Sequence, residues 1–383
     1  AFSNLSAQSY YPSWDSLFQV SRYGEDTLER IDANLKLATF YPGEFAYMVK
    51  YGTFAYEESQ AIGERKKMAS ALLFMATGYA KLDREEQGHS LFEKALDICL
   101  ELNDQERVGY TQGQLAALQL RMGNQKRAQT LLESAQKTLK EADASRPLTI
   151  VQRQYAKVLM DQERHSKAVP LLEDNFSRQR DLQSPPFLLV DALLPLADCH
   201  LQLREWSTAL EYLERADSLH ATNPAILEQQ PFQPLEASIL MAQTYFAKGE
   251  TALAKQALQR HEDWIKTYDP EYPNYEALHL KADIAENEGR TSQAAEYHKE
   301  AEAIEKAVDK EEASRKQNMI EELAEFEQSQ NALKELQADI EEKVEEQKQF
   351  IEDRKNENKR IYYMAALGMD EEVKKSKWAW VCT

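Results

Sequence analysis

The amino-acid sequence predicts an all-α fold, an α-solenoid of antiparallel helix pairs with repeats of about 40 residues, followed by a long coiled-coil helix. Three observations lead to this prediction. Glycine and proline number only 12 each among 383 residues, and alanine, leucine, glutamate, glutamine and lysine dominate, a composition that favours helix over sheet. One block of residues recurs along most of the chain. The segment from about residue 303 to 360 contains neither glycine nor proline.

The N-terminal 66 residues are expected to differ from the rest. Residues 1–21 are predicted to be a leader-like or disordered segment, because a few apolar residues precede small ones, with a cleavage point after Ala7. A frayed terminus is the equal alternative. Residues 22–66 are predicted to form two helices broken at Tyr41-Pro42-Gly43, an atypical pair that caps the stack, as terminal repeats often do.

Residues 67–305 carry the recurring block. Each copy has a Leu-Ala or Met-Ala pair early in one helix, a turn, and then the pattern Ala-x3-Leu/Phe-x2-Ala in the next helix. Small residues at these positions let the two helices of a pair approach closely, and the large apolar residues fill the gap to the next pair. The closing positions of the six copies are Ala95, Ala135, Asn175, Ala216, His261 and Ala301.

This block resembles the consensus of the tetratricopeptide repeat. The spacing of about 40 residues is longer than the usual ~34, and it looks like the extended variety of kinesin light chains and many bacterial signalling proteins. The chain departs from the consensus at Asn175, His261 and His298. A generic helical solenoid remains the alternative.

The resemblance also implies a binding surface. Ligand contacts in such arrays come from the inner, concave face of the first helix of each pair, so a protein or peptide ligand is expected there, in a groove that is basic in its middle and acidic toward its C-terminal half. The lysine/asparagine/arginine clamp of chaperone-binding relatives is not visible. The expected groove residues are Tyr110, Arg153, Lys157, Met160, Asp191, Asp198, Glu236, Gln243, Phe246, His279 and Asp283.

Residues 306–360 are predicted to form one long helix of a coiled coil, through which the chain forms a homodimer. A helix that folds back on the array is the alternative. Seven of ten heptad positions are apolar. The two registers are Met319, Phe326, Leu333, Ile340 and Gln347, and Leu323, Gln330, Gln337, Val344 and Ile351.

The last segment, residues 361–383, is predicted to be a tail that begins a membrane span, because Trp378 and Trp380 are residues of the membrane interface. The lysines just before them argue against an inward span from a periplasmic array.

The sequence predicts no catalytic, cofactor-binding or metal-binding site. The net charge of −19 disfavours nucleic-acid binding. The sequence has no phosphate-binding glycine loop, no HExxH and no GxSxG, so we expect neither an enzyme nor a cofactor. The histidines are scattered and predict packing rather than metal binding. Cys99 and Cys199 predict buried small residues rather than a disulfide.

The sequence therefore predicts a non-catalytic binding domain. The arrangement of a leader-like start, repeats, a coiled coil and an apolar edge is similar to the sensor regions of bacterial tetratricopeptide histidine kinases and regulators. That resemblance implies a periplasmic, membrane-tethered domain that signals through the coiled coil to an output domain beyond this chain. The alternative is a soluble cytoplasmic scaffold that bridges proteins.

Overall fold

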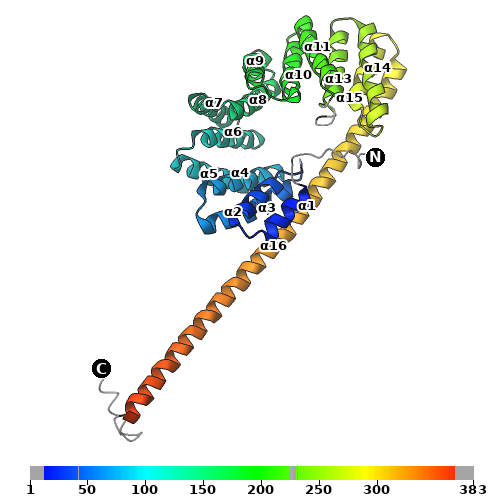
Figure 1. The fold of residues 1–383 in the computed structure, drawn as a ribbon. Helices are drawn as coiled ribbons and strands as arrows, with labels where there is room; N and C mark the ends of the chain where they lie inside the picture. The colour runs from blue at the N-terminus through cyan, green and yellow to red at the C-terminus, as the bar shows by residue number, and fades with distance from the viewer. Residues whose placement is uncertain (1–12, 42, 225, 227–229, 231, 367–383) are drawn as a thin grey trace. The chain divides into compact units, whose positions relative to one another are not determined.

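The computed structural model describes residues 13–41, 43–224, 226, 230 and 232–366. Within these residues it contains fifteen α-helices and no strand, which confirms the all-α prediction. The chain divides into two compact units, Ala1–Ile320 and Glu321–Thr383. The first unit holds the helix pairs (Figure 1).

The central helices follow a strict spacing. Eight successive helices of 17 residues each begin 20 residues apart, with one step of 21, so a pair repeats every 40 residues rather than ~34. These helices are α4 (Arg65–Lys81), α5 (Glu85–Glu101), α6 (Gln105–Arg121), α7 (Gln125–Glu141), α8 (Ser145–Asp161), α9 (His165–Asp181), α10 (Pro186–Gln202) and α11 (Trp206–Thr222).

One kind of turn produces this spacing. After α4, Asp83 has a φ of 59°, and the backbone N–H of Arg84 donates to the carbonyl of Tyr79 at 2.9 Å. This is a Schellman motif, in which a left-handed residue lets the chain satisfy the last carbonyls of the helix. The same left-handed position recurs at Asn103, Gly123, Asp143, Glu163, Gln183 and Arg204.

The small residues of the repeat lie where the helices of a pair cross. Gly88 shows how close the approach is, because a Cβ added there would lie 2.9 Å from the carbonyl oxygen of Ala76 in the preceding helix. The large residues of the repeat, such as Phe92, Leu132 and Leu172, are at most 2% exposed. The solenoid prediction is therefore confirmed at the level of individual packing positions.

The two departures at closing positions have a structural reason. Asn175 is buried, and its side-chain amide donates to the carbonyl of Thr149. His261 is also buried, with Nε2 3.1 Å from the side-chain oxygen of Asn274 and Nδ1 3.2 Å from the carbonyl of Leu235. Both polar residues satisfy backbone or loop groups, so both are structural members of the core.

Three helices precede the regular array: α1 (Trp14–Tyr23), α2 (Thr27–Leu37) and α3 (Phe45–Ile62). The helices α2 and α3 correspond to the predicted pair, and the break between them includes Tyr41 and Gly43. The helix α1 begins inside the segment 1–21 that was expected to be leader-like. Its Leu17 packs in one apolar cluster with Leu37 and Tyr51, so residues 14–21 belong to the folded unit. Residues 1–12 lie outside the described part of the chain.

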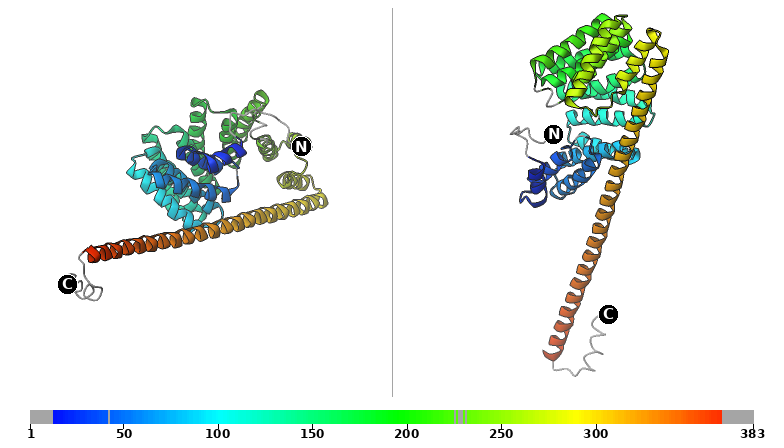
Figure 2. Two further views of the ribbon diagram at one scale, coloured as in Figure 1. Left: turned by 60° about the horizontal axis from the view of Figure 1, so that its bottom comes forward. Right: turned by 90° about the vertical axis from the view of Figure 1, so that its right-hand side faces the viewer.

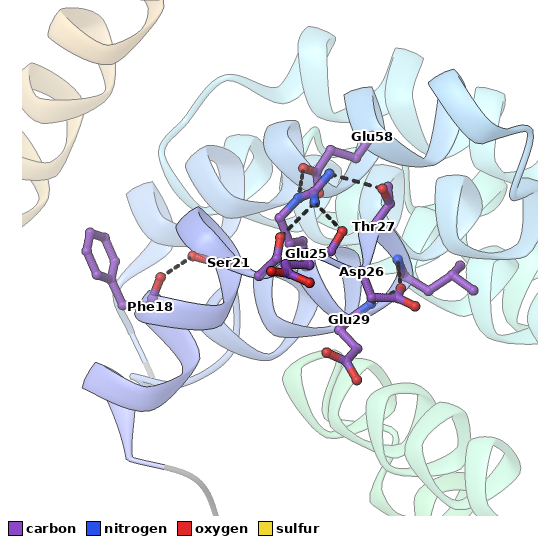
Figure 3. A network of polar contacts seen from close by, with 10 residues as sticks. Phe18, Ser21, Glu25, Asp26, Thr27, Glu29 and Glu58 are labelled. Atoms are coloured by element: carbon purple, nitrogen blue, oxygen red, sulfur yellow. Dashed lines mark hydrogen bonds and ion pairs between the residues drawn. The ribbon is translucent and has the colours of Figure 1, made fainter.

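Polar contacts fix the junction between α1 and α2 (Figure 3). The Asp26 carboxylate accepts from the backbone N–H groups of Leu28 at 2.6 Å and Glu29 at 3.1 Å and so caps α2. Arg30 donates to Glu58 of α3 at 2.7 Å and to the carbonyl of Gly24 at 2.9 Å. One guanidinium thus connects the end of α1, the start of α2 and α3.

The C-terminal part of the first unit consists of α13 (Gln233–Ala247), α14 (Thr251–Tyr268), α15 (Tyr275–Asn287) and the start of α16 (Thr291–Ala366). In Figures 1 and 2 the pairs follow one another along an arc, and residues 291–320 of α16 return to the N-terminal helices. There Arg315 pairs with Glu44 at 2.8 Å, and Lys316 pairs with Asp83. The domain boundary predicted between residues 305 and 306 falls inside this continuous helix, and the compact unit extends to Ile320.

The second unit is helical as far as Ala366. Leu323, near its start, is buried, whereas Leu333, Ile340 and Ile351 further along the helix are 50–53% exposed. The predicted coiled coil requires such a seam, but the pairing itself stays a prediction. Among the described helices none has an apolar stretch long enough to cross a bilayer. The proposed span begins in a tail of which residues 367–383 lie outside the described residues.

Candidate functional site: a groove along the first helices of the pairs

The first unit contains an open groove with a volume of about 880 Å³. It is lined mainly by α8, α10, α13 and α15, which are the first helices of four successive pairs, and by Glu305 of α16. Because the first helices carry their inner faces on one side of an arc, these faces converge. Eight of the predicted residues line it: Arg153, Lys157, Met160, Asp198, Glu236, Gln243, His279 and Asp283.

The other three predicted residues lie elsewhere. Tyr110 lines a separate hollow beside α4. Asp191 lies at a third hollow, where it pairs with Arg153 at 3.2 Å and accepts from the amide of Gln233 at 2.6 Å. Phe246, in the last turn of α13, packs against the largest apolar cluster and does not line the groove. A ligand contact at Phe246 therefore stays a prediction.

The groove also includes residues that the sequence interpretation missed. Tyr275 and Glu276 belong to the first turn of α15, and His165 to the first turn of α9. Glu305 reaches the groove from α16. Helix periodicity could have identified Glu276, because His279 and Asp283 lie three and seven residues further along the same helix. No local pattern could have identified Glu305, since its position depends on how α16 packs.

One side of the groove is positive. Lys157 lines it, and Arg153 lies one turn earlier on α8. Arg153 pairs with Asp191 at 3.2 Å, so Lys157 is the cation of this side that has no carboxylate partner among the described ion pairs. Lys157 and Arg153 therefore give this side a positive charge from α8, and a negative group would be stabilised there.

The other side is negative and lacks counter-ions. Desolvation in the groove raises the pKa of Glu236, and the charges of Asp191, Glu276 and Asp198 raise it further. Desolvation by the surrounding protein also raises the pKa of Glu276, although part of its side chain is exposed. Among the described residues no lysine, arginine or histidine lies within 4.0 Å of the carboxylate of Glu236 or Glu276. The groove thus holds uncompensated negative charge that a cation would stabilise.

The cysteines show no sign of catalytic activation. Cys99 and Cys199 are both fully buried, as predicted. Burial raises the pKa of both thiols, that of Cys199 to about 12. Neither thiol is therefore poised as a thiolate nucleophile near neutral pH.

Comparison with known protein families finds no matching family model, and no curated protein matches the sequence. Solved structures do match. A Rap protein complexed with competence and sporulation factor shares 14% identity, covers 77% of this chain and 80% of its own, and has a TM-score of 0.54. A Rap conjugation gene regulator in complex with a Phr peptide shares 13% identity, covers 79% and 81%, and has a TM-score of 0.51.

A third matching structure is described as a tetratricopeptide-repeat protein. A signal transduction ATPase with a tetratricopeptide repeat sensor, from Pyrococcus horikoshii, shares 13% identity over 78% of this chain, with a TM-score of 0.53. This chain spans about half of that protein, 48% of its length. Identities this low establish the fold alone. Together with the helix pairs, the small residues at their crossings and the inner-face groove, they show that this chain has the tetratricopeptide-repeat fold.

Proposed function

We propose that the chain is a non-catalytic binding domain whose groove takes an extended peptide, or a peptide segment of a protein, that carries both signs of charge. The observation that carries this proposal is the division of the groove into a positive side on α8 and a negative side on α10, α13 and α15, where Glu236 and Glu276 have no ion-pair partner among the described residues. The volume of about 880 Å³ is in the range of small-ligand sites, and the groove is open, as an extended chain requires.

The charges fix the direction in which such a ligand lies. A lysine, arginine or free amino group is placed beside Glu236 and Glu276, where a cation relieves the repulsion between carboxylates. An acidic side chain or free carboxylate is placed beside Lys157 and Arg153. The Rap regulator that was solved with a Phr peptide supports a peptide as ligand, because it has the same fold.

A selection experiment tests this proposal. A random peptide library displayed on phage is selected on the full chain, and the enriched peptides should combine a basic and an acidic residue. The double variant Glu236→Gln with Glu276→Gln should lose the basic preference, and Arg153→Glu with Lys157→Glu should lose the acidic one. Glu214→Gln, an exposed residue outside the groove, is the matched control. Enrichment that is unchanged in both double variants would contradict the proposal.

We further propose that binding is sensory and that α16 transmits it. The ligand in the groove lies beside Glu305 of α16, and about three helical turns later Arg315 and Lys316 of the same helix pair with Glu44 and Asp83. A ligand that changes the curvature of the arc therefore changes these pairs. In this interpretation the domain belongs to a bacterial signal-transduction protein with an output domain outside this chain.

Amide hydrogen exchange distinguishes this role from the alternative, a cytoplasmic scaffold. A peptide enriched in the selection should alter exchange in residues 291–320 if α16 transmits binding. Protection confined to α8, α10, α13 and α15 would favour the scaffold. The periplasmic, membrane-tethered location stays a prediction.

The homodimer through residues 306–360 is part of the same proposal. The half-exposed side chains of Leu333 and Ile340 support it, because a second copy would cover them. The double variant Leu333→Asp with Ile340→Asp should convert a dimer to a monomer in light scattering of the full chain. A dimer that survives would place the contact in the array.

A further inference from the structure

A cluster of metal-ligating side chains lies at the C-terminal end of the groove, between α15 and α16. One ligand atom each from Asp283, Glu286 and His298 lies within 4.8 Å of the other two. Asp283 and Glu286 are three residues apart on α15, so they face the same side of that helix. His298 faces them from α16, the second helix of the pair. Two antiparallel helices thus supply two oxygens and one nitrogen to one small volume.

The orientation of His298 is set by a second histidine. Its Nε2 lies 3.8 Å from the Glu286 carboxylate, and its Nδ1 lies 3.3 Å from Nδ1 of His279. Nε2 of His279 lies 3.6 Å from Glu305. Two facing neutral imidazole nitrogens need one donor and one acceptor. If Nδ1 of His298 donates, Nδ1 of His279 accepts and its Nε2–H points toward Glu305.

A His298 tautomer with the proton on Nδ1 leaves Nε2, the other ring nitrogen, unprotonated. In that tautomer Nε2 carries a lone pair and lies 3.8 Å from the Glu286 carboxylate, so the ligand atoms of the cluster are all electron-rich. A cation between them would turn this repulsion into coordination. Metal-bound histidines characteristically donate their other ring N–H to an acceptor, and the chain of His279 and Glu305 supplies that acceptor.

We propose that Asp283, Glu286 and His298 bind a divalent transition-metal ion of the zinc type, with His279 as the residue that positions His298. A nitrogen and two carboxylate oxygens suit such an ion, whereas magnesium and calcium prefer oxygen ligands alone. Three protein ligands leave a coordination position open. Asp283 and His279 also line the groove, so that open position is next to the space proposed for the peptide. The metal site does not depend on the peptide proposal.

Titration calorimetry of the metal-free full chain with zinc chloride tests the site. We expect one zinc ion per chain, bound well above a weak background from the surface carboxylates, and no comparable signal with magnesium chloride. His298→Ala and the double variant Asp283→Asn with Glu286→Gln should each weaken zinc binding at least about tenfold. The control is His89→Ala, because His89 also lies beside a glutamate, Glu93, at 3.5 Å but belongs to no group of three possible metal ligands among the described residues.

The positioning role of His279 has its own readout. His279→Ala should weaken zinc binding about 10–100-fold with the stoichiometry unchanged. His279→Gln should restore most of the affinity, because the glutamine oxygen also accepts from His298. All these side chains are at the surface or partly exposed, so circular dichroism should show folded variants. Zinc binding that is no stronger than magnesium binding, or that is unchanged in both ligand variants, would overturn the proposal.

Discussion

The regular array and the helix of residues 321–366 are both rich in charged residues with apolar side chains at helical spacing, yet these side chains have opposite surroundings. In the array Leu132, Leu172 and Leu213 are at most 1% exposed. In the second unit Leu333 and Ile340 are 52% and 50% exposed. Periodicity predicts a helix in both regions. In the array the same chain supplies the neighbouring helix that covers the apolar face, whereas Leu333 and Ile340 remain half exposed although Leu323 is buried, so the pattern alone does not specify their surroundings.

The largest expected effect is a difference in stability between alanine variants of the two regions. Leu132→Ala removes a fully buried side chain and should lower the free energy of unfolding by about 2–5 kcal/mol. Ile340→Ala removes a half-exposed side chain and should change the unfolding of the array by less than about 0.5 kcal/mol. Urea denaturation followed by circular dichroism measures both. Equal losses would mean that Ile340 is covered within one folded chain.

Lowering the pH should sharpen the comparison, because all seven histidines lie in the first unit. Burial lowers the pKa of His261 below the value of 6.5 expected when unfolded. The unfolded state therefore binds more protons, and the contribution of His261 to stability is complete above about pH 6.5 and is lost as the pH falls toward the folded pKa. The slope per group is at most about 1.4 kcal/mol per pH unit.

The variant His261→Gln isolates this contribution. It should show a flatter fall in unfolding free energy between pH 7 and pH 5 than the unmodified chain, although it is less stable at neutral pH. His89→Ala serves as the control, since His89 is partly exposed on α5 beside Glu93, whereas His261 is buried in the core. An unchanged slope in His261→Gln would assign the pH dependence to other groups.

The smallest expected effect concerns the turns, which the second unit lacks among its described residues. Glu163 is exposed and holds a φ of 57°, a conformation that costs a side chain about 1–2 kcal/mol and costs glycine nothing. Glu163→Gly should therefore raise the thermal midpoint slightly, with a gain of up to about 1 kcal/mol. Glu214→Gly, at an exposed position inside α11, should lose a similar amount. If both glycine variants were less stable than the unmodified chain, the side chain of Glu163 would be shown to stabilise its turn.

Sequence reasoning succeeded where one helix contacts its sequence neighbour. The small and large positions of the repeat, such as Ala128 and Leu132, predict the pair packing, and their spacing predicts the arc. Eight groove residues followed from that packing. Phe246, in the last turn of α13, packs against the core and does not line the groove. Glu305 was missed because a side chain from a returning helix leaves no periodic signal in the sequence.

The contact between Arg315 and Glu44 joins residues 271 positions apart, in an array whose other packing is mostly between sequence neighbours. Neighbouring pairs can assemble early and in any order, since their contacts close short loops. This ion pair can form only after all the intervening helices have taken their places. Because each helix adds a fixed step to the arc, one missing or unfolded pair would carry Arg315 away from its partner. The ion pair between Arg315 and Glu44 therefore depends on complete folding of the array. It should form last, and unfolding of any helix pair between the two residues should break it.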